Sequence, residues 1–218
     1  AVSPAEATAL AIKVDETIGT DRANLATTPA EVADGNTDDD TVAPVNQYLG
    51  QATSSVSGGL TALFSVTADA GQDGEASNTG TLSLVLNGAS NGKLATNLSA
   101  TNGGAISLVM DGSSVVGKDA TGTGDVVFRI SIVNTGTDAA PVYQLQTTLY
   151  EAINHSGTTT TFDEAIKLLT SSGALQLKYE VTLVDGDSDS ITQSDTVNLT
   201  GSTNSDSFFS FQDDGPAL

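Results

Sequence analysis

The clearest chemical signal in this 218-residue chain is a set of carboxylates at alternate positions around a glycine. Asp185, Asp187 and Asp189 lie in the segment Asp-Gly-Asp-Ser-Asp, directly after a strand-like run at 175–183. Three carboxylates at this spacing can converge on one hard cation, as in the first half of an EF-hand loop. The twelfth position from Asp185 is Thr196 instead of Glu, and strands flank the segment, so an EF-hand is excluded. We therefore expect calcium at a strand-to-strand turn, with a solvated acidic hairpin as the alternative.

Two further acidic segments could supply oxygen ligands to a cation. The stretch 34–40 contains three consecutive aspartates, which repel one another unless a cation or open water separates their charges. The other segment, at 69–75, contains Asp69, Asp73 and Glu75. The candidate metal ligands in these segments are Asp34, Asn36, Asp38, Asp40, Asp69 and Asp73.

Carboxylates also lie close to both ends of the chain. If the chain is one unit of a tandem array, the end of one unit abuts the start of the next, and the two sets could share calcium and stiffen the junction. The candidate junction ligands are Asp15, Glu16, Asp213 and Asp214.

The overall composition agrees with a cation-binding role. The formal net charge is −20, with 7 Lys plus Arg against 27 acidic residues, of which 20 are Asp and 7 are Glu. Asp suits turns and compact oxygen cages, whereas a helix-rich acidic surface would use Glu freely. The alternative is a solvated acidic surface adapted to salt water. Such a chain lacks the cations needed to bind nucleic acid or an anionic membrane. Because it also has no cysteine, its stability must come from core size or bound ions.

Enzyme signatures are weak, and we expect no catalytic residues. The segment 88–92 matches the spacing of a nucleophile elbow, but no helix is predicted after it, so a hairpin loop is expected. His155 is the single histidine, and a role in a turn is expected for it. Without Cys, and with one His, a zinc site is not expected. A carbohydrate-active enzyme with a carboxylate pair is the remote alternative, although the chain has no Trp and four Tyr.

Alternating apolar and polar residues predict a β-rich fold. The run 174–183 is apolar on odd positions and polar on even ones, and similar runs occupy 81–86 and 125–132. Further strands are expected at 10–14, 60–67, 105–110, 114–117, 142–150, 191–199 and 208–211. Turn clusters of Asn, Asp, Thr and Gly separate them. The predicted fold is all-β, an antiparallel two-sheet β-sandwich that is Ig-like in the broad sense.

One short helix and one long acidic loop complete the expected fold. The helix is predicted at 162–169, where Phe162, Ala165, Ile166 and Leu169 share a face. The loop or insertion covers 27–56, rich in Asp, Ala, Thr, Pro and Gly. We expect residues 1–9 to be a linker and residues 10–218 a single module. Residues 1–6 lack the features of a signal peptide, so a piece of a longer polypeptide is expected, with its export signal elsewhere, and no apolar run is long enough to span a bilayer.

Several landmarks occur together in a recognisable order. They are 14–17 (Val-Asp-Glu-Thr), 63–69, 82–84, 115–117, 125–128, 152–155, 181–187 (Val-Thr-Leu-Val-Asp-Gly-Asp) and 211–216 (Phe-Gln-Asp-Asp-Gly-Pro). This arrangement resembles the long repeat unit of type I-secreted RTX adhesins, the very large surface proteins of Gram-negative bacteria, over about residues 10–218. The nonapeptide pattern Gly-Gly-x-Gly-x-Asp of the calcium β-roll is absent.

The resemblance implies a calcium-rigidified β-sandwich module at the bacterial cell surface, supporting attachment and biofilm formation. Its partners would be neighbouring modules of the same polypeptide, and the excised module is expected to be a monomer that inserts into no membrane. Because the segment 27–56 is longer than a spacer needs, the alternative is a dedicated ligand-binding domain. Such a domain would hold a host or microbial peptide or glycan through calcium, at 34–40 or at 185–189.

Overall fold

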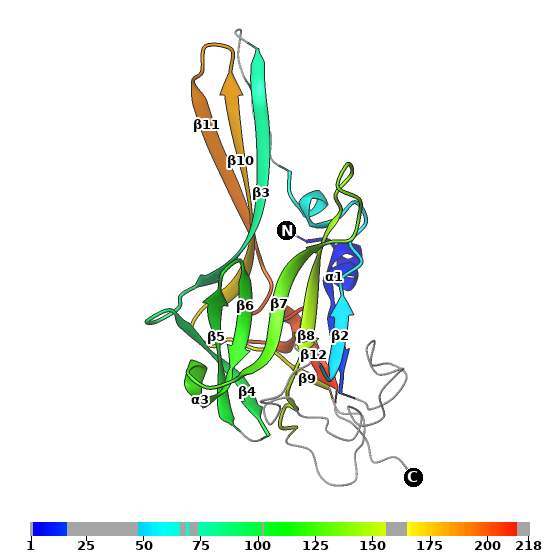
Figure 1. Ribbon diagram of the computed structural model, residues 1–218, viewed down its shortest axis with the longest axis vertical. Helices are drawn as coiled ribbons and strands as arrows, with labels where there is room; N and C mark the ends of the chain where they lie inside the picture. The colour runs from blue at the N-terminus through cyan, green and yellow to red at the C-terminus, as the bar shows by residue number, and fades with distance from the viewer. Residues whose placement is uncertain are drawn as a thin grey trace.

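The computed structural model describes residues 2–16, 48–65, 69, 74–101, 103–155 and 165–212. Within these ranges the chain forms twelve β-strands arranged in three sheets, with a few short helices. The strands pack as two layers around one apolar core, and part of one sheet extends beyond them (Figure 1). The prediction of an all-β sandwich is confirmed.

The first layer is a six-stranded antiparallel sheet in the order β2-β8-β7-β6-β5-β4. Consecutive strands from β4 to β8 lie next to one another, so most of this sheet is a simple meander. Its strands are β2 (Gly50–Thr53), β4 (Lys93–Ala100), β5 (Gly104–Asp111), β6 (Ser114–Lys118), β7 (Val126–Asn134) and β8 (Tyr143–Leu149).

The opposite layer is divided into two three-stranded sheets. The sheet β1-β12-β9 joins the two ends of the described chain, and its β1 and β12 run parallel to each other. The sheet β11-β10-β3 is antiparallel throughout. The strands are β1 (Ile12–Asp15), β3 (Glu75–Asn87), β9 (Ala165–Lys167), β10 (Ala174–Asp185), β11 (Ser190–Asn198) and β12 (Phe209–Gln212).

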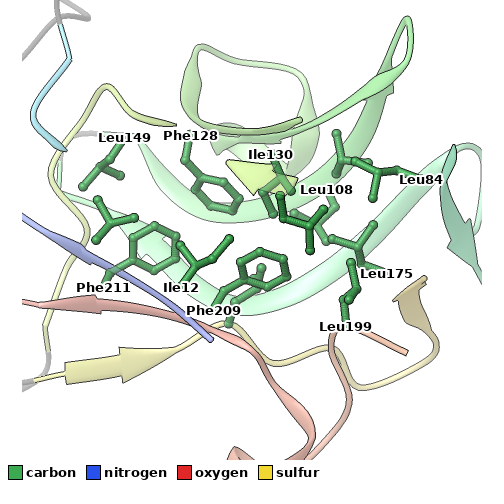
Figure 2. Close-up of a cluster of buried hydrophobic side chains, with 14 of the residues drawn as sticks. Ile12, Leu84, Leu108, Phe128, Ile130, Leu149, Leu175, Leu199, Phe209 and Phe211 are labelled. Atoms are coloured by element: carbon green, nitrogen blue, oxygen red, sulfur yellow. The ribbon is translucent and has the colours of Figure 1, made fainter. Parts of the chain in front are cut away.

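Aromatic and branched side chains from both layers form the core (Figure 2). Phe128 of β7 contacts Phe211 of β12, with ring centroids 5.1 Å apart, and both side chains are fully buried. Phe128 also lies against Gly117 of β6, where a methyl group would overlap the ring. Leu175 and Leu84 continue the core under β10 and β3. Because every second side chain of these strands is buried in the core, the strands could be predicted from the alternation of apolar and polar residues in the sequence.

The helices are short, and the first of them was not predicted. Helix α1 (Pro4–Leu10) begins with a capping box between Ser3 and Glu6 and has Pro4 in its first turn. Residues 4–9 of the expected linker at 1–9 are therefore helical. The others are η1 (Leu60–Leu63), α3 (Asp119–Gly122) and η3 (Asn204–Asp206).

The predicted helix at 162–169 is wrong where the structure describes it. Ala165–Lys167 form β9, which pairs antiparallel with β12, so that Ile166 lies opposite Phe211. The four apolar residues at helical spacing gave only a weak local preference, and burial of Ile166 and Leu168 against the core outweighs it. Phe162 to Glu164 lie outside the described residues.

The predicted strand at 60–67 is also wrong at its start. Leu60–Leu63 form the 3-10 helix η1, which follows two glycines, Gly58 and Gly59, with φ of 77° and 81°. This left-handed backbone breaks an extended run, and it buries Leu60 completely. Within the expected long loop at 27–56, residues 48–56 are described and contain β2, and the rest lies outside the described residues.

The outer halves of β3, β10 and β11 form an arm that projects from the sandwich (Figure 1). Along β11 almost every residue is exposed, and β3 is exposed from Glu75 to Thr81. The turn between β10 and β11 lies at the tip of this arm, far from the core. The arm therefore places the predicted calcium turn at one extreme of the molecule.

Candidate metal centre

Asp185, Asp187 and Asp189 come together in the turn at the tip of the arm. One carboxylate oxygen from each lies within 4.8 Å of the others, and this is the one such acidic group among the residues that the structure describes. Asp185 is half-buried, and the other two are exposed. The structure thus brings the three carboxylates together at a strand-to-strand turn, whereas their role as ligands of a metal ion stays a prediction.

Main-chain hydrogen bonds fix the shape of this turn. The N–H of Asp189 donates to Oδ1 of Asp185 at 2.9 Å, and the Asp185 N–H donates to the Asp189 carbonyl at 3.0 Å. Ser188 adopts a left-handed conformation with φ of 77°, and its N–H donates to the Asp185 carbonyl at 3.2 Å. These bonds fold the backbone so that all three carboxylates face one region.

The carboxylates strongly influence one another's protonation. A hydrogen bond with Asp187 lowers the pKa of Asp185 below its ordinary value, and main-chain N–H groups act in the same direction. The same hydrogen bond, together with the negative charge of Asp185, raises the pKa of Asp187. Of these two carboxyls, Asp187 therefore takes up a proton first as the pH falls. At neutral pH a divalent cation bound by the same oxygens would relieve the repulsion between the carboxylates.

Of the other ligands predicted in the loops at 34–40 and 69–75, only Asp69 lies within the described residues. Asp69 is exposed and lies outside the group at the tip of the arm. Asp34, Asn36, Asp38, Asp40, Asp73, Asp213 and Asp214 lie outside the described residues, so they stay predictions. Asp15 ends β1, where it pairs with Gln212, and its side chain is not described.

Glu16, expected at a calcium junction, is buried and makes contacts within the module. Its Oε1 accepts a hydrogen bond from the Ile153 N–H at 3.1 Å and lies 3.3 Å from Nε2 of His155. The side chains of Glu16 and His155 are 5% and 4% exposed. Both residues make further interactions. This contact joins the end of β1 to the segment after β8, and the expected role of His155 in a turn stays a prediction.

Replacing Glu16 with glutamine tests whether this carboxylate stabilises the module or serves a metal. We expect Glu16→Gln to lower the free energy of unfolding by about 1.5–3 kcal/mol, because a buried charged acceptor loses its charge. Urea unfolding in EDTA measures the change without any metal. Glu180→Gln is the control, because its exposed pair with Lys178 contributes little. A loss seen in calcium but absent in EDTA would instead assign Glu16 to a metal site.

Two adjoining hollows lie near the opposite end of β10 from the tip. The larger has a volume of about 660 Å³ and is lined by hydroxyl and amide side chains, including Thr170, Asn198 and Thr200. Asp206 is the single acidic residue in its lining, and this carboxylate accepts hydrogen bonds from the Thr203 N–H and hydroxyl. The carboxylate pair required by the glycosidase alternative is therefore not present in this lining.

Comparison with known families places the chain in a family whose function is not known. A family model described as Domain of unknown function (DUF5801) matches residues 11–200, and the chain belongs to this family. A search of curated proteins finds no match, and neither does a search of the solved structures. Among the described residues, no helix is both long enough and apolar enough to cross a membrane.

Proposed function

We propose that this chain is a calcium-dependent extracellular module of a giant RTX adhesin, which supports cell attachment and biofilm formation at the bacterial surface. The convergence of three carboxylates at the tip of the arm carries this proposal. The donor set is made only of oxygens, which is what calcium prefers and zinc does not. The order of motifs along the chain supplies the link to RTX adhesins.

The arm explains how calcium would act on the shape of the module. With net charge −20, the chain repels itself, and the tip concentrates three of its carboxylates in one turn. A bound cation removes this repulsion and locks the turn that joins β10 to β11. Calcium is scarce inside cells and abundant outside, so the arm would become rigid only after export. In a tandem array, a rigid arm would hold its tip away from the sandwich, where a neighbouring module or another surface can reach it.

A calcium titration with one altered carboxylate tests this site. We expect Asp187→Asn to weaken calcium binding about tenfold or more, since even outer-shell changes at metal sites cost 10–100-fold in affinity. Isothermal titration of the intact chain measures both affinity and stoichiometry. Asp138→Asn removes the same charge at an exposed position outside the tip and is expected to leave affinity nearly unchanged. Equal affinities for the wild type and Asp187→Asn would contradict a metal centre at the tip.

The pH dependence of binding follows from the same pair of carboxyls. The pKa of Asp187 is raised from 3.8, so the proton that competes with calcium binds more tightly than to an ordinary aspartate. As pH falls, calcium affinity is expected to decline before the pH reaches 3.8, because Asp187 takes up its proton before Asp185, whose pKa is lowered. In Asp187→Asn this early decline should disappear. Titrations at descending pH measure the effect, and an identical pH profile in the variant would exclude Asp187 as the competing group.

A further inference from the structure

A buried carboxylate without a partner lies in the turn between β6 and β7. Asp119 is 8% exposed, and its Oδ1 is enclosed by protein without any hydrogen-bond partner. The described part of the chain contains no ion pair to Asp119 either. An anion in such a place costs several kcal/mol unless a compensating charge is present. This residue therefore calls for a ligand that neutralises it.

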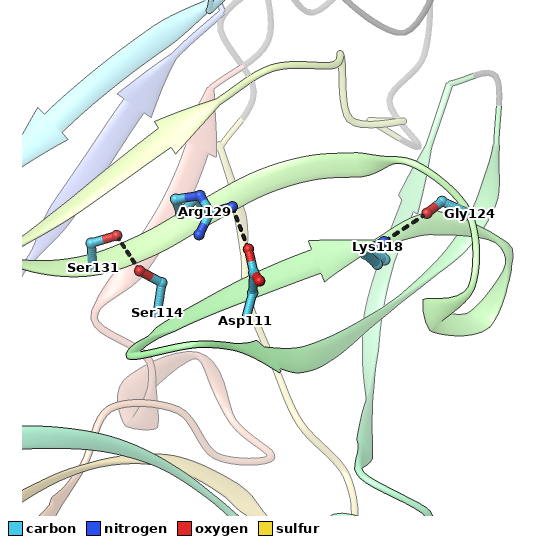
Figure 3. Close-up of polar contacts among 6 residues, drawn as sticks. All are labelled: Asp111, Ser114, Lys118, Gly124, Arg129 and Ser131. Atoms are coloured by element: carbon cyan, nitrogen blue, oxygen red, sulfur yellow. Dashed lines mark hydrogen bonds and ion pairs between the residues drawn. The ribbon is translucent and has the colours of Figure 1, made fainter. Parts of the chain in front are cut away.

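Another aspartate of this layer, Asp111, has a compensated charge and so differs from Asp119. Asp111, at the end of β5, is exposed, and its Oδ2 lies 2.6 Å from Nη2 of Arg129 (Figure 3). Its charge is thus both hydrated and paired. Asp119 has neither form of compensation, although it is the more buried of the two.

Two lysines reach the loop of Asp119 but contact its carbonyls. Nζ of Lys118 donates to the Gly124 carbonyl at 3.2 Å (Figure 3), and Nζ of Lys93 donates to the Thr121 carbonyl at 3.2 Å. Neither ammonium group comes within ion-pair distance of the Asp119 carboxylate. Neither lysine therefore forms an ion pair with the buried carboxylate.

The backbone encloses the carboxylate on two sides. The Asp119 carbonyl accepts hydrogen bonds from the N–H groups of Thr123 and Gly124 at 3.2 and 3.3 Å, so the loop closes on itself. Gly103, in the turn between β4 and β5, and Gly124 both lie against the carboxylate. A methyl group at either glycine would overlap the Asp119 oxygens. Only glycine at these two positions allows main chain from two turns to approach the carboxylate so closely.

The turn also holds strained backbone. Ala120 and Thr121 have φ of 44° and 57°, a left-handed conformation that costs about 1 kcal/mol or more for residues with a Cβ. This conformation brings the Ala120 N–H to the Gly103 carbonyl at 3.2 Å, and the Asp119 N–H donates to the Asp125 carbonyl at 3.2 Å. Two main-chain carbonyls are thereby held at the N–H groups of Asp119 and Ala120, each with a second lone pair.

We propose that Asp119 is the anionic ligand of a second divalent-cation site, separate from the tip of the arm and built from the two glycine turns. The available donors are the carboxylate and the carbonyls of Gly103 and Asp125, all of them oxygens, which favours calcium. The ion would tie the turn between β4 and β5 to the turn between β6 and β7. The site lies on the six-stranded sheet, so this proposal does not depend on the metal centre at the tip.

Counting calcium ions in matched variants tests the second site. Isothermal titration of the intact chain is expected to show at least one fewer ion in Asp119→Asn than in the wild type, while Asp138→Asn keeps the wild-type number. In Asp187→Asn the tip loses affinity and the Asp119 site remains, so failure of one site is distinguishable from failure of the other. An unchanged ion count in Asp119→Asn would overturn the proposal.

A measurement on the unaltered chain covers the case in which Asp119→Asn does not fold. Crystals of the wild-type protein soaked in terbium, which replaces calcium at oxygen sites, are expected to show an anomalous peak beside the Asp119 carboxylate. A peak at the tip of the arm with none beside Asp119 would refute the second site alone. The absence of any peak would refute both sites.

Discussion

Phe128→Ala is expected to lower the free energy of unfolding by about 3–5 kcal/mol, the cost of removing a fully buried aromatic ring from a core. Phe128 is the residue through which the six-stranded sheet contacts Phe211 of the opposite layer, with ring centroids 5.1 Å apart. The space cannot collapse easily, because Gly117 has no side chain to move into it. The loss should therefore lie toward the upper part of this range.

Urea unfolding followed by circular dichroism measures this effect, in EDTA so that metal binding does not contribute. Met110→Ala is the matched control, because Met110 lies in β5 of the same sheet but is 43% exposed. It should change the free energy of unfolding by no more than about 0.5 kcal/mol. If Phe128→Ala cost less than 1 kcal/mol, the two layers would not be held together by this contact.

Much of the sandwich could be predicted from the sequence because burial on one face imposes a period of two. The alternation at 174–183 became β10, and the runs at 81–86 and 125–132 fall within β3 and β7 apart from the first residue of the latter. The loop expected at 88–92 is present and β4 follows it without a helix, but the expectation of a hairpin is wrong, because the loop joins β3 to β4 of a different sheet. β4 itself was missed, because its polar residues interrupt the alternation.

Pairing between distant segments explains what the sequence did not predict. Nothing local indicates that Ala165–Lys167 pair with β12, or that β1 runs parallel to β12. Helix α1 is a different case, because its Ser-Pro-Ala-Glu start is a recognisable capping box that could have been found. The 3-10 helix η1 depends on the conformation of Gly59, which no pattern of apolar residues reveals.

Of the two candidate metal sites, the one at the tip of the arm could be predicted from the sequence and the one at Asp119 could not. At the tip of the arm, three aspartates at alternate positions lie within five residues, so the spacing alone brings them together. Asp119 is a single aspartate before a glycine-rich turn, and the sequence does not distinguish it from an aspartate that is exposed to solvent. Its burial arises from Gly103, which belongs to another turn, and the absence of a partner is a tertiary property. For the same reason Glu16 could not be distinguished from an exposed ligand.

Calcium is expected to raise the melting temperature of this module substantially. An ion that binds only the folded chain stabilises it by about 2.7 kcal/mol when its free concentration is a hundredfold above the dissociation constant. For a domain of this size, that corresponds to about 5–10 °C per ion. The effect should be larger than for a neutral domain, because the ion also relieves repulsion in a chain of net charge −20.

The most direct test of the central claim is a thermal melt of the purified chain in EDTA and in millimolar calcium at the same ionic strength. Magnesium at the same concentration is the control for general screening of charge. The account predicts that calcium raises the melting temperature by about 5 °C or more, and that magnesium raises it much less. Equal melting temperatures in EDTA and in calcium would contradict a calcium-dependent module.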